Sequence, residues 1–231
     1  MKRNERERAP SSGSDPQSAF LSEPPRMAWP LKLLLRSVER SIGKRLVANR
    51  ILGWYPKALI GSGFLEAFVA HDESEAPKRL LSMVRIFVSF RVSCAFCIDM
   101  NSQHFKDAGL SEADIETLRS IAADPGSIAG DAFTLKERAA LRYAASITST
   151  PVSFDAGNVA LVRELYGERG MVILASTAAQ VNFWARLIQS LGVPPAGFSS
   201  SCRVLHLDEY KTIRVPDLNA TQALTRHQEK A

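Results

Sequence analysis

Helix signals recur along most of this chain, and no repeated alternation of strands and helices accompanies them. Two capping boxes, in which a Ser or Thr precedes an acidic residue by three positions, predict helix starts at Ser111 and Thr134. A later helix over residues 171–191 is predicted to end at Gly192, with two prolines close behind, as expected at a helix C-terminus. With at least six such segments, the sequence predicts an all-α fold.

The first half of the chain is less regular, although helices still fit it best. Apolar residues recur at helical spacing over residues 31–47. Residues 79–92 fit two structures. Alternate residues from Val84 to Val92 are apolar, as in a half-buried strand, but the apolar residues from Leu80 onward also form one face of a helix. Periodicity does not decide between them, and the helical context favours a helix.

The two ends of the chain differ in composition from its middle. Residues 1–26 combine alternating Arg and Glu with a Ser- and Pro-rich stretch that buries too little apolar surface to offset the entropy of ordering. We therefore expect a disordered basic tail there. Residues 27–198 are expected to form one helical domain, since 231 residues with 45% hydrophobic content suffice for one core. Residues 199–231 are predicted to form a C-terminal arm.

Charge and cysteine content argue against several classes of protein. The net charge is +5, but many of the basic residues lie in the opening residues or are scattered singly, so we expect no nucleic-acid partner. The most apolar windows are short or interrupted by Arg85 and Arg91, so we expect no membrane span or membrane partner. Three cysteines are too few for a disulfide framework, and a signal-peptide pattern is missing, which favours the cytoplasm.

Cys94 and Cys97 form the one motif with strong chemical content. A structural zinc site needs four ligands, and this pair with His104 supplies three. Haem attachment needs a histidine directly after the second cysteine, where Ile98 stands. We therefore expect no metal and no cofactor. Two interpretations remain open: a redox dithiol at a helix start, where backbone N–H groups favour the thiolate, or two buried apolar side chains.

Four segments in order between Leu31 and Pro195 resemble one known superfamily: CAFCIDMNSQHFKDAGLSEADIETL, FTLKERAALRYAASIT, VRELYG and AAQVNFWARLIQSLGVPP. They are similar to segments of the carboxymuconolactone decarboxylase and alkylhydroperoxidase D-like (AhpD-like) superfamily. This resemblance implies an AhpD-like helical bundle that assembles into homo-oligomers, with the CxxC motif at the start of a core helix. It also implies a peroxiredoxin-type activity, in which Cys97 attacks a small hydroperoxide, Cys94 resolves the sulfenic acid, and a dithiol reductant of unknown identity restores the pair.

The redox-active members of that superfamily also use a proton relay. Its glutamate, twelve residues before the first cysteine, corresponds to Ser82, and its histidine, four residues after the second, corresponds to Asn101. Loss of a positioned acid–base group typically slows a reaction on the order of 10²- to 10⁴-fold. Asp99 is interpreted as a carboxylate favoured by the helix dipole, not as a base. Further candidates for the relay or the pocket are His104, Arg91, Asn182 and Trp184.

Three functions are consistent with these residues. The first is a thiol-dependent antioxidant peroxidase that uses Cys97 and Cys94. The second is a binding or assembly protein on a catalytically degenerate AhpD-like scaffold, which Ser82 and Asn101 motivate. The third is a non-redox enzyme of the lactone decarboxylase type, in which the cysteine pair is incidental. The presence of both cysteines argues against this third function.

Overall fold

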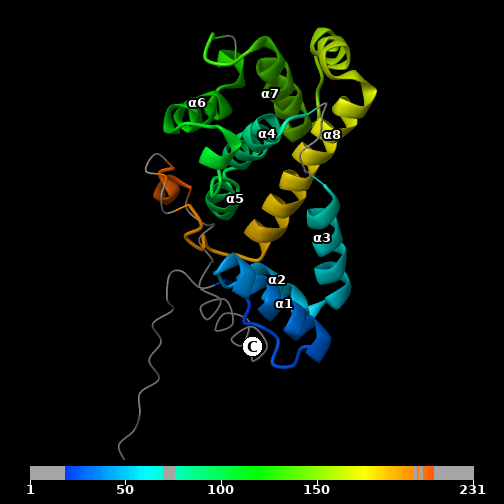
Figure 1. Ribbon diagram of the computed structural model, residues 1–231, viewed down its shortest axis with the longest axis vertical. Coiled ribbons are helices and arrows are strands. Elements are labelled where there is room, and N and C mark those ends of the chain that lie inside the picture. The colour runs from blue at the N-terminus through cyan, green and yellow to red at the C-terminus, as the bar shows by residue number, and fades with distance from the viewer. Residues whose placement is uncertain (1–18, 70–75, 129, 200–201, 203–204, 211–231) are drawn as a thin grey trace, which may run out of the picture.

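The computed structural model describes residues 19–69, 76–128, 130–199, 202 and 205–210. All regular structure within these residues is helical, which confirms the predicted all-α class (Figure 1). In the described part of the chain the α-helices are α1 (Trp29–Ile42), α2 (Val47–Ile51), α3 (Pro56–Phe68), α4 (Lys78–Arg91), α5 (Ala95–Asn101), α6 (Glu112–Ala123), α7 (Leu135–Thr148) and α8 (Ala156–Ser190). Short 3-10 helices lie between these helices at η1 (Leu52–Trp54), η2 (Lys106–Ala108) and η3 (Pro125–Ser127), and after α8 at η4 (Leu207–Glu209).

Residues 79–92, whose pattern fitted both a strand and a helix, correspond to helix α4 at the centre of the core. It packs against α5, α6, α7 and α8. Met83, Val84, Ile86, Phe87 and Val88 have no exposed surface. Because neighbours cover α4 on nearly every side, its apolar residues surround the helix instead of marking one stripe. This burial explains why periodicity alone fitted a strand as well.

Helix α8 contains the predicted helix over residues 171–191 up to Ser190 and begins upstream of it, at Ala156. Gly167 breaks it with a backbone φ of 66°, a left-handed value that favours glycine. The second part runs through the core, where Leu174, Ala178 and Ala185 are buried. Helix α8 is long and apolar enough to cross a membrane. This is weak evidence for a membrane span, because core helices of soluble proteins can be equally long and apolar. In Figure 1 this part extends from α7 to α2.

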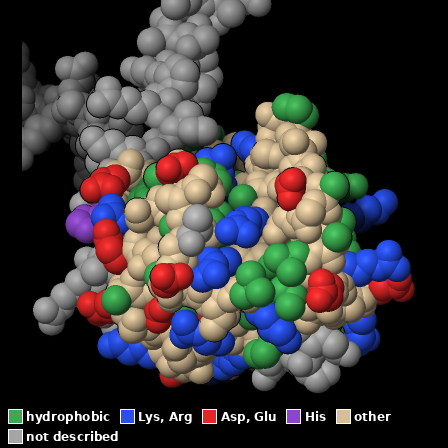
Figure 2. Space-filling model, turned by 90° about the horizontal axis from the view of Figure 1, so that it is seen from above, with side chains coloured by type: hydrophobic (Ala, Val, Ile, Leu, Met, Phe, Trp, Pro, Cys, Tyr) green, Lys and Arg blue, Asp and Glu red, His purple; other side chains and the backbone are tan. Residues whose placement is uncertain are grey.

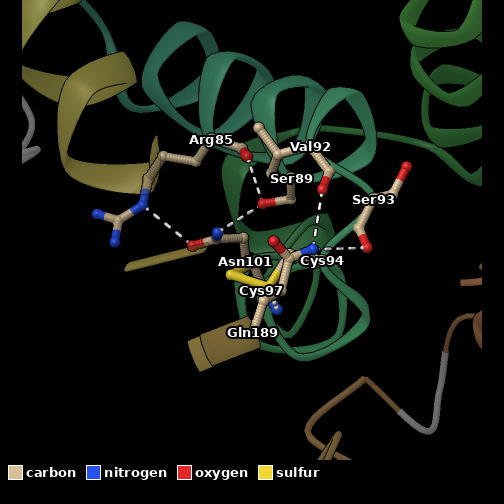
Figure 3. The surroundings of a disulfide bond; sticks show 8 residues. All are labelled: Arg85, Ser89, Val92, Ser93, Cys94, Cys97, Asn101 and Gln189. Carbon is tan, nitrogen blue, oxygen red and sulfur yellow. Dashed lines mark hydrogen bonds between the residues drawn. A yellow bond between two sulfur atoms is a disulfide. The ribbon is translucent and has the colours of Figure 1, made fainter. Parts of the chain in front are cut away.

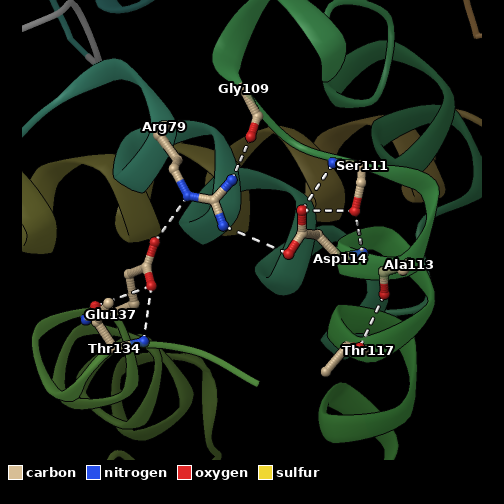
Figure 4. A network of polar contacts seen from close by, with 8 residues as sticks. All are labelled: Arg79, Gly109, Ser111, Ala113, Asp114, Thr117, Thr134 and Glu137. Carbon is tan, nitrogen blue, oxygen red and sulfur yellow. Dashed lines mark hydrogen bonds and ion pairs between the residues drawn. The ribbon is translucent and has the colours of Figure 1, made fainter. Parts of the chain in front are cut away.

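Both predicted capping boxes are present, and one arginine of α4 connects them. Ser111 and Asp114 cap α6, while Thr134 and Glu137 cap α7. Arg79 donates from Nε to Glu137 at 2.9 Å and from Nη2 to Asp114 at 3.4 Å (Figure 4). Each of the two carboxylates thus caps the N-terminus of one helix. Through Arg79 they also hold α4 against the starts of α6 and α7.

The chain ends bear on the predicted domain limits. Residues 1–18 of the proposed tail lie outside the described residues. Phe20 N donates to Leu191 O at 3.1 Å, so the chain contacts the body before residue 26. Beyond residue 199, Cys202 and Leu205 are buried against the main core. On the face in Figure 2, basic and acidic side chains are both spread over the surface.

Candidate functional site

The two cysteines lie at the N-terminus of α5 and form a disulfide. Cys94 is the N-cap residue, and its Sγ accepts the backbone N–H of Cys97 at 3.3 Å. Their Cα atoms are 5.2 Å apart, within the range for disulfides. Cys94 is 1% exposed and Cys97 4% exposed. The spacing therefore places the two sulfurs in bonding reach at a helix start, as a redox pair requires.

A tight connection from α4 sets the position of Cys94 (Figure 3). Ser93 adopts a left-handed φ of 52°, and Cys94 N donates to Ser89 O at 3.2 Å. From α8, Gln189 Nε2 donates to Val92 O at 3.0 Å and to Ser93 O at 3.1 Å. These bonds hold the strained turn against α8, so that the first cysteine begins α5.

A small cavity of about 80 Å³ opens beside Cys97. Cys97 lines it and Cys94 does not. A molecule in the cavity would therefore meet the second cysteine first, while the first stays behind it. The lining comes from α2, α3, α4, α5 and α8: Ala48, Asn49, Gly63, Glu66, Arg85, Phe96, Cys97, Met100, Asn101, Val181 and Trp184.

Arg85 links the polar residues of this cavity. Its Nε donates to Asn101 Oδ1 at 3.1 Å, and its Nη2 donates to Glu66 Oε1 at 2.9 Å. Asn101 Nδ2 in turn donates to Ser89 Oγ at 2.9 Å, and that hydroxyl donates to Arg85 O at 2.7 Å (Figure 3). The Asn101 amide is thus fixed in one orientation, one turn after Cys97.

Glu66 is the residue that sequence reasoning missed. Its Oε2 accepts Gln180 Nε2 at 2.8 Å and Trp184 Nε1 at 3.0 Å, so α8 and α4 both hold the carboxylate at the cavity. Glu66 precedes Cys94 by 28 positions, and no local spacing relates the two. The sequence feature that could have indicated Glu66 is that it is the only acidic residue in the apolar helix α3.

The other predicted site residues lie in different places. Trp184 and Asn101 line the cavity, but Ser82, His104, Arg91 and Asn182 do not. Ser82 is half-buried on α4, one turn before Arg85. His104 is exposed, with Nδ1 3.0 Å from Asp107 Oδ2.

Two polar candidates are directed at other helices. Arg91 Nη1 donates to Ala122 O at the end of α6, at 3.4 Å. Asn182 Nδ2 donates to Thr148 Oγ1 of α7 at 3.1 Å. Arg85 is consequently the arginine beside Cys97, a place that the sequence suggested for Arg91.

Asp99 has a structural role. It is 1% exposed, and its carboxylate accepts the backbone N–H groups of Ala196, Phe198 and Ser199 at 2.9–3.0 Å. These bonds fasten the segment after α8 to the helix that begins at the cysteines. Among the described residues, no group of three His, Cys, Asp or Glu side chains is placed to hold a metal ion.

Residues 62–146 match the model of the Carboxymuconolactone decarboxylase family. This range includes the cysteine pair and seven of the eleven residues that line the cavity at Cys97. No curated protein sequence matches the chain. The sequence resemblance to this superfamily is confirmed by the family match together with the structural neighbours below.

Several solved structures share the fold at low sequence identity. An uncharacterised peroxidase-related protein from Silicibacter sp. TM1040 has a TM-score of 0.65 at 13% identity, over 83% of this chain and 97% of its own. The AhpD core of an uncharacterised peroxidase-related protein from Ralstonia eutropha JMP134 has a TM-score of 0.63 at 13% identity, over 77% and 92%. The debrominase Bmp8, as a variant in complex with 2,3,4-tribromopyrrole, has a TM-score of 0.63 at 17% identity, over 84% and 100%. These likenesses confirm an AhpD-like all-α fold.

Proposed function

We propose that this chain is a thiol-dependent peroxidase that reduces small hydroperoxides with Cys97 and Cys94, which the family match over residues 62–146 supports. One observation carries this proposal: Cys97 lines a cavity that also holds a carboxylate and a guanidinium, with Cys94 in bonding reach behind it. An incidental pair of core cysteines has no need of such neighbours.

The first step needs Cys97 as a thiolate. The N-terminus of α5 and the positive charge of Arg85 both favour the thiolate over the thiol. Glu66 is the carboxylate in the cavity lining, and we assign it the proton from Cys97, taken directly or through water. The sulfur then attacks the outer oxygen of the hydroperoxide. An S–O bond forms, the O–O bond breaks, and the alkoxide leaves as an alcohol with the proton that Glu66 returns.

The second step uses Cys94. Its thiolate attacks the sulfur of the Cys97 sulfenic acid, an S–S bond forms, and water leaves with the displaced oxygen. The protein has then given two electrons to the peroxide and is in the disulfide form. A dithiol reductant returns the two electrons and two protons by thiol–disulfide exchange, which closes the cycle.

Cavity size favours a small substrate. One water molecule takes about 30 Å³ of liquid volume, so about 80 Å³ suits hydrogen peroxide or a short alkyl hydroperoxide. Phe96, Met100 and Trp184 give the cavity apolar walls that suit a short alkyl group. A bulky hydroperoxide would need those side chains to move.

The test is consumption of hydrogen peroxide or ethyl hydroperoxide with dithiothreitol as reductant. We expect turnover in the unmodified chain and in Cys202→Ser, because Cys202 is buried and outside the disulfide. We expect none in Cys97→Ser or Cys94→Ser. Turnover that persists in Cys97→Ser would contradict the proposal. A stable protein with no turnover in any variant would favour a binding or assembly role, and lactone decarboxylation without either cysteine would favour the third function.

The likeness to a debrominase favours a second candidate, reductive dehalogenation of a small aromatic ring. In that reaction two thiols supply two electrons, a carbon–bromine bond becomes a carbon–hydrogen bond, and bromide leaves as the disulfide forms. Phe96 and Trp184 offer aromatic faces to such a ring, although both would have to move to admit a bromopyrrole to the cavity. Bromide release from a bromopyrrole, measured beside peroxide consumption, separates the two reactions.

A further inference from the structure

A second and larger cavity, of about 630 Å³, lies away from the cysteines. It is formed by η3, the middle of α7 and the first turns of α8, and it shares no lining residue with the cavity at Cys97. Its volume falls within the range of small-molecule sites, about 300–1,000 Å³. Neither the family match nor the reaction proposed above gives this cavity a role.

Two opposite charges line this cavity without pairing. Half-buried Arg142 of α7 donates from Nη2 to Ile128 O at 3.2 Å. Exposed Asp155 accepts the N–H of Asn158 at Oδ1, at 2.7 Å, where it caps α8. Within the described part of the chain, neither charge belongs to an ion pair, although both face one space. The cavity lining thus contains a half-buried cation and an exposed anion.

Asn158 adds an acceptor that lacks a donor. It lines the cavity and is 9% exposed, and its Nδ2 donates to Ala139 O at 3.3 Å. Its Oδ1 is buried and has no hydrogen-bond partner among the described residues. A buried acceptor without a donor is costly, so an N–H group that reached it would stabilise this wall of the cavity.

Part of the remaining wall is apolar, although Ser146 also lines the cavity. Ile128 is 3% exposed, and Ala145 and Leu161 are half-buried beside it. This wall lies with the two charges in one cavity. An aliphatic group would displace water from it without leaving any polar atom unpaired.

We propose that this cavity is a second ligand site, which binds a free α-amino acid with an aliphatic side chain. The ligand carboxylate pairs with Arg142, its ammonium group pairs with Asp155, and its side chain packs on Ile128, Ala145 and Leu161. A zwitterion matches both charges at once, whereas a simple anion meets Asp155 and a simple amine meets Arg142. The proposal does not depend on the peroxidase assignment.

The test is calorimetric titration of the full chain with three probes of one shape. L-leucine carries both charges, 4-methylpentanoate lacks the ammonium group, and 3-methylbutylamine lacks the carboxylate. We expect leucine to bind at least about tenfold more tightly than either single-charge analogue. Equal binding of the three probes, or no heat of binding with leucine at millimolar concentration, would overturn the proposal.

Variants locate the binding. Arg142→Gln and Asp155→Asn should each weaken leucine binding at least about tenfold, and Asn at position 155 keeps a good helix cap. Arg163→Gln is the matched control, because Arg163 is exposed on α8, pairs with Glu168 and does not line the cavity. Circular dichroism verifies that the variants fold. If leucine binds Asp155→Asn and Arg142→Gln as tightly as the unmodified chain, the ligand lies elsewhere and the assignment fails.

Discussion

Asn101 lies one helical turn after Cys97, and its Oδ1 accepts the Nε–H of Arg85 at 3.1 Å. The same guanidinium holds Glu66, which comes from α3, at 2.9 Å. The two relay positions expected from the resemblance hold Ser82 and Asn101, neither of which ionises in the ordinary pH range. A carboxylate nevertheless lines the cavity, supplied by a different helix. The proposed chemistry therefore depends on Glu66 and Arg85.

Replacing Glu66 by Gln should slow peroxide turnover about 100-fold, because the amide cannot take the proton from Cys97. The side chain keeps its size and an acceptor for Trp184 and Gln180, so the fold should be intact. Steady-state peroxide consumption measures the effect. Glu164→Gln, at an exposed position on α8, is the control and should be unchanged. Turnover of Glu66→Gln within about twofold of the unmodified chain would remove Glu66 from the mechanism.

Replacing Arg85 by Met should lower the reactivity of Cys97, because the positive charge beside the cavity favours the thiolate. In the reduced protein with Cys94 and Cys202 changed to Ser, we expect alkylation by iodoacetamide at pH 7 to slow about tenfold. Arg85→Lys keeps the charge and should retain most of the rate. An unchanged rate in Arg85→Met would show that the helix N-terminus alone sets the thiol reactivity.

Changing Asn101 to His should raise turnover at least about tenfold, since it places an acid–base group one turn from Cys97 at the cavity. His104→Ala is the paired control. His104 is exposed beside Asp107, outside the cavity, and its loss should leave turnover unchanged. Peroxide consumption measured from pH 5.5 to 8 should show a new titration in Asn101→His alone. Equal pH profiles in the unmodified chain and this variant would contradict the expectation.

The network around Arg79 predicts how stability depends on pH. Burial alone would raise the pKa of Asp114 and of Glu137, but the capping hydrogen bonds and the Arg79 guanidinium outweigh it and lower both pKa values. Groups whose pKa is lower in the folded protein stabilise it above their unfolded values, here 3.8 and 4.5. That contribution is lost as the pH falls below about 4.5 through the folded values.

Arg79→Met should therefore cost about 1 kcal/mol at pH 7, a modest figure because the arginine side chain is 36% exposed. Near pH 3, below both unfolded values, the cost should be smaller, because part of the stabilisation by the two carboxylates has been lost. Urea unfolding at both pH values measures it, with Arg163→Met as an exposed control. A cost that is equal at pH 7 and pH 3 would show that packing, and not the charge network, accounts for the effect.

Local signals predicted the parts of this fold that local chemistry controls. The capping boxes at Ser111 and Thr134 were found because a side chain and a backbone N–H three positions away satisfy each other. The position of the cysteine pair at a helix start was expected from the family resemblance, and the structure has Cys94 as the N-cap of α5. Helix α4 was ambiguous because burial on all sides removes the stripe on which periodicity depends.

The cavity depends on tertiary contacts, and there the sequence was insufficient. Glu66, Arg85 and Trp184 lie on three helices and meet only when α3 packs beside α4 and α8. Arg91 and Arg85 are both arginines of α4, and the spacing to Cys94 gave no means to choose between them. Their roles follow from the side of α4 on which each lies, which the packing of α6 and α3 determines.

The most direct test of the proposed chemistry is a time course of intact mass and free-thiol content. The reduced Cys202→Ser variant is mixed with one equivalent of hydrogen peroxide, and samples are quenched with acid. We predict rapid loss of both remaining thiols together with two hydrogen atoms of mass, as Cys94 and Cys97 form their disulfide. If both thiols persist, or are oxidised only as slowly as an ordinary free cysteine, the pair is not a peroxide-reducing dithiol.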